Sequence, residues 1–176
     1  MMRKEANNTV GLFFCYDTYM NVEELVRRYI REGMMMQVAT IKGDQPWVCT
    51  VYYVPDEELN LYWISTPERR HSREIAGHPK VAGAIPVKHA PDGGVVGLQF
   101  EGQAQRITDQ DEIQKIMKLY VNRYTMRLPT GDGWYRDFIA GKNPYKLYRI
   151  KPSLFVLFDE ETFPATRDMS GNRLSN

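Results

Sequence analysis

The stretch at residues 65–73 reads S-T-P-E-R-R-H-S-R and holds the residue types of an anion-binding site. The hydroxyl groups of Ser65 and Thr66 can donate hydrogen bonds to phosphate oxygens, and an arginine can grip a phosphate with two parallel bonds. The stretch follows a predicted strand and begins a predicted helix, whose N-terminus attracts negative charge. A capped surface helix with solvated arginines would show the same residues, so both interpretations stay open at this point. Four potential cations lie close together in it: Arg69, Arg70, His71 and Arg73.

Other site chemistries find no support in the residue pattern. The two cysteines, Cys15 and Cys49, form neither a metal-binding spacing nor a disulfide framework, and we interpret both as small thiols in a reducing compartment. The histidines do not lie at the spacing of metal ligands, so we expect no metal centre. The chain holds no G-x-S-x-G elbow, and its Gly93-Gly94 pair lacks the surroundings of a nucleotide-binding fingerprint.

Length and charge narrow the class of protein further. At 176 residues the chain is long enough for one domain with a substantial core, and 43% of its residues are hydrophobic. Its 23 Lys and Arg against 22 Asp and Glu leave a net charge of +1, which argues against a nucleic-acid or membrane binder acting through its overall field. Because the chain has no long apolar run and opens on no signal segment, we expect a cytoplasmic protein.

The elements that must position residues 65–73 can be predicted from periodicity and turn signals. Apolar residues at helical spacing predict two long helices, at 21–32 with Asn21 as N-cap and at 109–127. Thr66 and Pro67 predict the start of a short helix running to about Gly77. Residues 128–144 read as a long irregular loop with a short helix at 135–140. Runs of β-branched and aromatic residues predict strands over 34–42, 47–54, 61–64, 81–87, 95–107 and 146–159.

These elements predict an α+β fold built on a small antiparallel barrel of about six strands, with the helices on the outside. The first three strands follow one another so closely that we expect an antiparallel meander. In the last strand, Pro152 must lie at an edge or a bulge. We expect residues 1–20 to form an N-terminal arm, residues 21–158 the barrel domain and residues 159–176 a polar tail.

Aromatic strands flank the predicted phosphate site. Most of these aromatic residues should belong to the core or to an interface. A planar cofactor lying against the strand at 47–54 would nonetheless use this layout. Backbone groups at residues 49–52 would address its ring atoms while its phosphate reaches Arg70 and His71.

Five segments together resemble the pyridoxamine 5′-phosphate oxidase-like, FMN-binding split-barrel family. They follow in order over about residues 21–158, and their combined order and spacing carry the resemblance. They read V-A-T-I-K-G-D-Q-P-W-V from Val38, L-Y-W-I-S-T, R-R-H-S-R-E-I-A-G-H-P ending at Pro79, G-L-Q-F-E-G-Q-A-Q-R-I from Gly97, and Y-R-I-K-P from Tyr148.

The resemblance implies a homodimer with one FMN in each of two sites at the subunit interface. The family's basic pair on the FMN phosphate falls on Arg70 and His71, where histidine replaces the commoner lysine and makes phosphate affinity more sensitive to pH. Gln99 resembles a glutamine that reaches the flavin from the partner subunit. The cofactor-binding positions implied in this way are Cys49, Thr50, Val51, Tyr52, Ser65, Thr66, Arg69, Arg70, His71 and Gln99.

The chain also departs from the true pyridoxamine-phosphate oxidases. Their C-terminal substrate-holding segment, rich in Arg and His, has no counterpart in the ending D-E-E-T-F-P-A-T-R-D-M-S-G-N, and Phe158 stands where that branch carries a tryptophan. We therefore expect an FMN-dependent oxidoreductase of unknown substrate, with an electron donor such as NAD(P)H. A flavin or haem storage module on the same barrel is the alternative. A third reading, a nucleic-acid-binding barrel, conflicts with the near-zero net charge.

Overall fold

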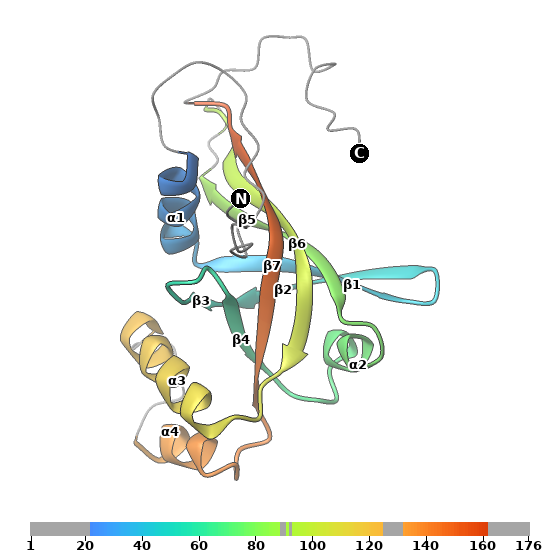
Figure 1. Ribbon diagram of the computed structural model, residues 1–176, viewed down its shortest axis with the longest axis vertical. Coiled ribbons are helices and arrows are strands. Elements are labelled where there is room, and N and C mark those ends of the chain that lie inside the picture. Colours follow the sequence, from blue (N-terminus) through green and yellow to red (C-terminus); the bar gives the residue numbers. More distant parts are fainter. Residues whose placement is uncertain (1–21, 89–90, 92, 125–131, 162–176) are drawn as a thin grey trace, which may run out of the picture.

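The computed structural model describes residues 22–88, 91, 93–124 and 132–161. One curled sheet dominates it, with helices packed around the sheet (Figure 1). The helices are α1 (Val22–Glu32), α2 (Arg70–Gly77), α3 (Gln110–Tyr124) and α4 (Asp132–Ile139). The strands are β1 (Met35–Lys42), β2 (Gln45–Tyr52), β3 (Val54–Pro55), β4 (Leu61–Ser65), β5 (Lys80–Lys88), β6 (Val96–Arg106) and β7 (Lys146–Asp159).

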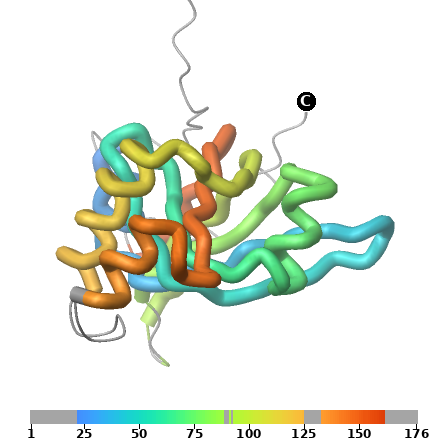
Figure 2. Tube along the Cα trace, turned by 90° about the horizontal axis from the view of Figure 1, so that it is seen from below, coloured from blue at the N-terminus to red at the C-terminus, as the bar shows by residue number. Residues whose placement is uncertain are grey.

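The seven strands form a single antiparallel sheet in the order β2-β1-β5-β6-β7-β4-β3. The sheet curls into a half-barrel, which confirms the predicted α+β barrel fold. The β1–β2 hairpin projects on the side of the molecule away from α3 and α4 (Figures 1 and 2). β2 is therefore an edge strand, and one row of its backbone groups has no strand beside it in the described part of the chain.

Two glycines make this sheet sterically feasible. Gly43 has φ +62° in the two-residue turn between Lys42 and Gln45, a left-handed conformation that residues with a side chain rarely adopt. At Gly83 in β5, a Cβ atom would lie 2.1 Å from the backbone oxygen of Gln37 and 2.3 Å from Cζ of Phe100. Only glycine lets β1 and the ring of Phe100 approach β5 so closely.

Burial divides the sheet into an inner and an outer face. Met36, Val38, Ile85 and Leu98 are buried in the main core, which α1 covers, while Met35, Gln37, Pro86 and Gln99 beside them in the strands are exposed. A second apolar cluster joins α3 and α4 to β4 at the other end of the molecule. In the part of the chain that the structure describes, every helix is too short or too polar to cross a membrane.

The sheet corrects the prediction of a three-stranded meander. β4 pairs with β7 and with the short β3, but not with β2, because the chain breaks at Tyr53 and turns away from the first hairpin. The predicted strand at 47–54 is accordingly two elements, β2 and the short β3. Tyr53 is fully buried and its hydroxyl donates to the Ile30 carbonyl at 2.7 Å, so a tertiary contact decides this break.

The bounds of other elements also differ from the predicted ones. α2 begins at Arg70 and not at Pro67, since residues 66–69 form a turn closed by the bond from Arg69 N to Thr66 O. α4 occupies much of the predicted irregular loop, and Trp134 and Phe138 stack within it. Pro152 lies at a register shift between β6 and β7, which confirms the predicted bulge. The predicted N-terminal arm, the Asn21 cap and most of the polar tail lie outside the described residues.

Candidate functional site

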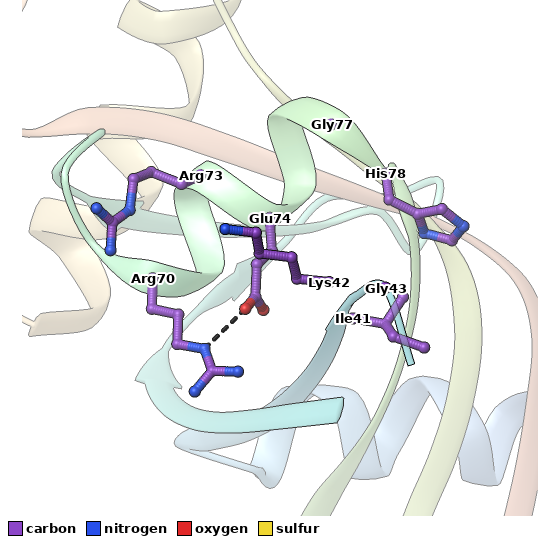
Figure 3. Close-up of a pocket in the computed structure, with 8 residues that line it drawn as sticks. All are labelled: Ile41, Lys42, Gly43, Arg70, Arg73, Glu74, Gly77 and His78. Atoms are coloured by element: carbon purple, nitrogen blue, oxygen red, sulfur yellow. Dashed lines mark hydrogen bonds and ion pairs between the residues drawn. The ribbon is translucent and has the colours of Figure 1, made fainter. Parts of the chain in front are cut away.

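Arg70 is held on two sides at the start of α2. Its Nε donates to Oε1 of Glu74 at 2.7 Å, one helical turn along (Figure 3). Its guanidinium carbon lies 4.4 Å from the centre of the Trp47 ring. In the described part of the chain its two terminal nitrogens donate no hydrogen bond. The Arg70 side chain is 40% exposed, so these nitrogens can reach a ligand.

Glu74 is the buried partner in this pair. Its side chain is 3% exposed, and its second oxygen accepts a hydrogen bond from the Thr40 hydroxyl at 2.5 Å. The bonds from Arg70 and Thr40 hold the pKa of the Glu74 carboxyl below its usual value, so the carboxylate is charged at neutral pH. Thr40 belongs to β1, and the pair therefore ties α2 to the sheet.

His71 turns inward instead of toward solvent. Its Nε2 lies 2.8 Å from the hydroxyl oxygen of Ser65, to which Ser72 also donates at 3.3 Å, and all three side chains are buried. Burial, aided by the positive charge of Arg69, lowers the pKa of His71. His71 is thus neutral near pH 7 and acts as a hydrogen-bonding group, whereas the four-cation reading of residues 69–73 counted it as a cation.

The N-terminus of α2 lacks a capping side chain. Arg69 occupies the N-cap position with an extended backbone, and its side chain makes no capping hydrogen bond. The first amide groups of a helix have no partner inside it and favour an anion. Thr66, predicted to cap this helix, stands in the preceding turn.

The four predicted positions on β2 divide between the two faces. Cys49 and Val51 pack against the main core, while Thr50 and Tyr52 lie on the exposed outer face. Burial raises the pKa of the Cys49 thiol to about 11, so it is no reactive thiolate at neutral pH. What β2 offers a ligand is therefore the side chains of its outer face and a backbone edge that no described strand covers. The Tyr52 carbonyl at the end of this edge already accepts from the Tyr120 hydroxyl.

Gln99 lies apart from the predicted site residues on β2. The strand registers place Thr50, Gln37, Ala84 and Gln99 in one row across β2, β1, β5 and β6. Three strand spacings separate Thr50 from Gln99, which is about 14 Å. Within one protomer Gln99 therefore does not reach Thr50 at the edge of β2.

A cavity of about 820 Å³ lies along α2 beside the tip of the β1–β2 hairpin. Lys42, Arg70 and Arg73 contribute positive charge to it, against the single carboxylate of Glu74 (Figure 3). No ion pair of Arg69 or Arg73 occurs among the described residues. The cavity therefore has a net positive lining next to the start of α2.

The sequence analysis missed three residues that organise this site: Thr40, Trp47 as the stacking partner of Arg70, and Glu74. The i, i+4 spacing of Arg70 and Glu74 was a readable signal for their ion pair. The contacts with Thr40 and Trp47 join segments at least 23 residues apart and have no local signal.

The buried, uncharged state of His71 predicts acid sensitivity. Below pH 6.5 the unfolded chain takes up a proton at His71 that the folded protein resists, so stability falls from pH 6.5 down through the lowered folded pKa. The lowered pKa of Glu74 adds a second loss, below pH 4.5. Melting temperatures measured from pH 7 to 5 should fall for the wild type and fall less for His71→Gln, whose amide can reach Ser65. Parallel curves for the two proteins would contradict this role of His71.

Comparison with known proteins places the chain among other split barrels. The family model described as pyridoxamine 5′-phosphate oxidase matches residues 22–156. A UPF0306 protein of Haemophilus ducreyi is 25% identical over 116 residues, which cover 64% of this chain and 80% of that protein. A UPF0306 protein of Pasteurella multocida is 27% identical over 103 residues, or 57% of this chain and 67% of the other.

Solved structures show the same fold at low sequence identity. A conserved hypothetical protein of Mycobacterium tuberculosis superimposes with a TM-score of 0.68 at 16% identity, covering 88% of this chain and 94% of the other. HutZ, the haem storage protein of Vibrio cholerae, gives 0.60 at 17% identity, with coverages of 79% and 96%. An FAD-binding protein of Mesorhizobium loti gives 0.59 at 16% identity, with coverages of 77% and 92%. Because the family model spans most of the chain, this protein belongs to the pyridoxamine 5′-phosphate oxidase-like split-barrel family.

Proposed function

We propose that this protein binds FMN and is an FMN-dependent oxidoreductase. The observation that carries the proposal is the arrangement around Arg70. Its terminal nitrogens are available at the uncapped start of α2, beside a positively lined cavity and near the free edge of β2. The phosphate of a phosphate-bearing ring compound would contact the Arg70 cation and the helix amides, and its ring would lie against the backbone of the strand.

The residues at α2 suit the phosphate end. Arg70 would grip the phosphate through its terminal nitrogens, and the first amides of α2 would donate to the remaining oxygens. Ser65 and Thr66 add hydroxyl groups, although Ser65 is already bonded to His71. In this proposal Arg70 carries the charge, and His71 orients Ser65.

The edge of β2 suits the ring end. The backbone N–H and C=O groups of residues 49–51 that face away from β1 can pair with the ring heteroatoms of a flavin, whereas the Tyr52 carbonyl already accepts a hydrogen bond from the Tyr120 hydroxyl at 2.6 Å. FMN, when bound, supplies the electron-transfer chemistry, and the chain's own residues hold it, orient it and exclude water. NADH or NADPH is the electron donor we expect.

We propose further that the working form is a homodimer. The outer face of the sheet exposes apolar side chains that a monomer would leave in water: Met35, Val48, Tyr52, Val156 and Phe158. A partner on this face would complete the ring site at β2. It would also bring the partner's Gln99 to the flavin, which this protomer's Gln99 cannot reach across three strands.

Haem storage is the second function to weigh, because HutZ shares the fold. A haem site needs an axial ligand such as a free histidine nitrogen. Nε2 of His71 is engaged by Ser65, which favours flavin over haem at this histidine. His78 lines the same cavity as Arg70, and His89 lies outside the described residues. We place the protein in the cytoplasm, in keeping with the free, half-buried thiol of Cys49.

The test is a visible spectrum of the purified protein, followed by titration of the flavin-free protein with FMN and then by addition of NADPH. Flavin bands, saturable FMN binding and reduction by the donor are the expected results. A Soret band would favour the haem function. Failure to bind FMN at any accessible concentration would overturn the proposal.

A further inference from the structure

We propose that Glu74 is a positioning residue for Arg70, which it holds ready for the phosphate group of the flavin. This inference rests on the proposed FMN function and adds a residue to its phosphate site. A carboxylate beside an anion site would ordinarily oppose binding, because like charges repel. The contacts of Glu74 indicate the opposite role.

Glu74 itself is held at both oxygens. Oε1 accepts from Arg70 Nε at 2.7 Å and Oε2 accepts from Thr40 at 2.5 Å, while the side chain is almost completely buried. A carboxylate fixed in this way cannot swing out to follow solvent or ligand. It therefore gives Arg70 a stationary anchor that joins α2 to β1.

Glu74 is bonded to Nε of Arg70, which lies outside the pair of terminal nitrogens that can grip a phosphate. Nε is bonded to the carboxylate, and the two terminal nitrogens point away from it (Figure 3). The Trp47 ring, 4.4 Å from the guanidinium carbon, restricts the remaining rotation. Glu74 and Trp47 thus set the orientation of the planar Arg70 guanidinium and leave its two terminal nitrogens available for a bidentate contact.

The surrounding charges keep the site attractive to an anion. Lys42 and Arg73 line the same cavity as Arg70 and Glu74. The other titratable groups around α2 are Arg69, His78, the exposed Glu68, the Cys49 thiol on β2 and the buried, neutral His71. Because Arg70 offsets the charge of Glu74, Lys42 and Arg73 still give the cavity a positive balance. Pre-orienting Arg70 lowers the entropy lost on binding without cancelling the attraction.

The experiment compares FMN with riboflavin, which lacks the phosphate, on the flavin-free protein. Dissociation constants are measured by quenching of flavin fluorescence for the wild type, Glu74→Ala, Glu74→Gln and Glu68→Ala. Glu68→Ala is the matched control, since it removes an exposed carboxylate just before α2. Circular dichroism and melting curves establish that each variant is folded.

Glu74→Ala should weaken FMN binding about tenfold or more and change riboflavin binding less than about twofold, because only the phosphate contact is lost. Glu74→Gln keeps an oxygen for Arg70 Nε and an amide for Thr40, so it should retain the preference for FMN within about threefold. Glu68→Ala should resemble the wild type. If Glu74→Ala does not fold, Thr40→Val replaces it, with an expected loss of about threefold confined to FMN.

The results that would contradict the inference can be told apart from one another. Unchanged or tighter FMN binding by Glu74→Ala would overturn the inference and make Glu74 a competitor of the phosphate for Arg70. Equal losses for FMN and riboflavin would also overturn it, since they would mark Glu74 as a support of the fold alone. A wild type that binds neither compound would overturn the proposed function itself, and with it the inference.

Discussion

Arg70→Ala is expected to weaken FMN binding about a hundredfold and to leave riboflavin binding nearly unchanged. A charge-assisted hydrogen bond contributes about 1.5–3 kcal/mol, and a bidentate grip on phosphate lies at the upper end of that range. A loss of about 2.8 kcal/mol corresponds to a factor of about one hundred. Arg70 can contribute this much because Glu74 and Trp47 already hold its guanidinium in place. Isothermal titration calorimetry with FMN and riboflavin measures the difference.

Two variants make this result specific. Arg136→Ala removes an exposed arginine on α4, far from the site, and should bind FMN like the wild type. Arg70→Lys keeps the charge but loses the fork and the bond to Glu74, so it should recover only part of the affinity. If Arg70→Ala bound FMN as tightly as the wild type, Arg70 would no longer belong among the phosphate-binding residues.

Val48→Glu is expected to dissociate the proposed homodimer and to reduce flavin binding with it. Val48 is 57% exposed in the protomer and lies on the outer face of β2, opposite Ala39. A carboxylate buried there without a partner would cost several kcal/mol, enough to weaken dimerisation at least about a hundredfold. Sedimentation equilibrium gives the dimer dissociation constant, and flavin absorbance at each protein concentration gives the occupancy.

The matched control introduces the same charge elsewhere. Gln114→Glu places a carboxylate on the exposed side of α3, away from the outer face, and should leave both dimerisation and flavin binding unaffected. Flavin occupancy of Val48→Glu should rise with protein concentration, because each site needs two chains. A monomeric wild type that binds FMN fully would contradict the shared site.

The elements of this protein could be predicted from the sequence because their signals are local. Leu25, Val26, Tyr29 and Ile30 lie on one side of α1 and are all buried, as their helical spacing predicted. β7 has the predicted bounds, and Pro152 lies at the predicted bulge. Residues 65–73 stood out because hydroxyl and basic side chains cluster over a few positions, and such clusters need no knowledge of the fold.

Partners across the sheet could not be predicted in this way. The pairing of β4 with β7 joins residues between 81 and 89 positions apart, and only the closing of the sheet around its core selects it over a meander. The tertiary structure also decides whether neighbouring basic residues have the same surroundings. Arg70 rests on Trp47, His71 is buried against Ser65, and Arg73 lines the cavity.

The sequence by itself thus determined the antiparallel barrel fold, its helices and the basic segment with its family resemblance, because each follows from spacing along the chain. Only the tertiary structure decided that His71 is a neutral, buried group. It also decided that Arg70 is anchored by Glu74 and that Gln99 lies three strands from Thr50. The physical reason is that burial and cross-strand contacts set the charge and direction of a side chain, and both depend on residues remote in sequence.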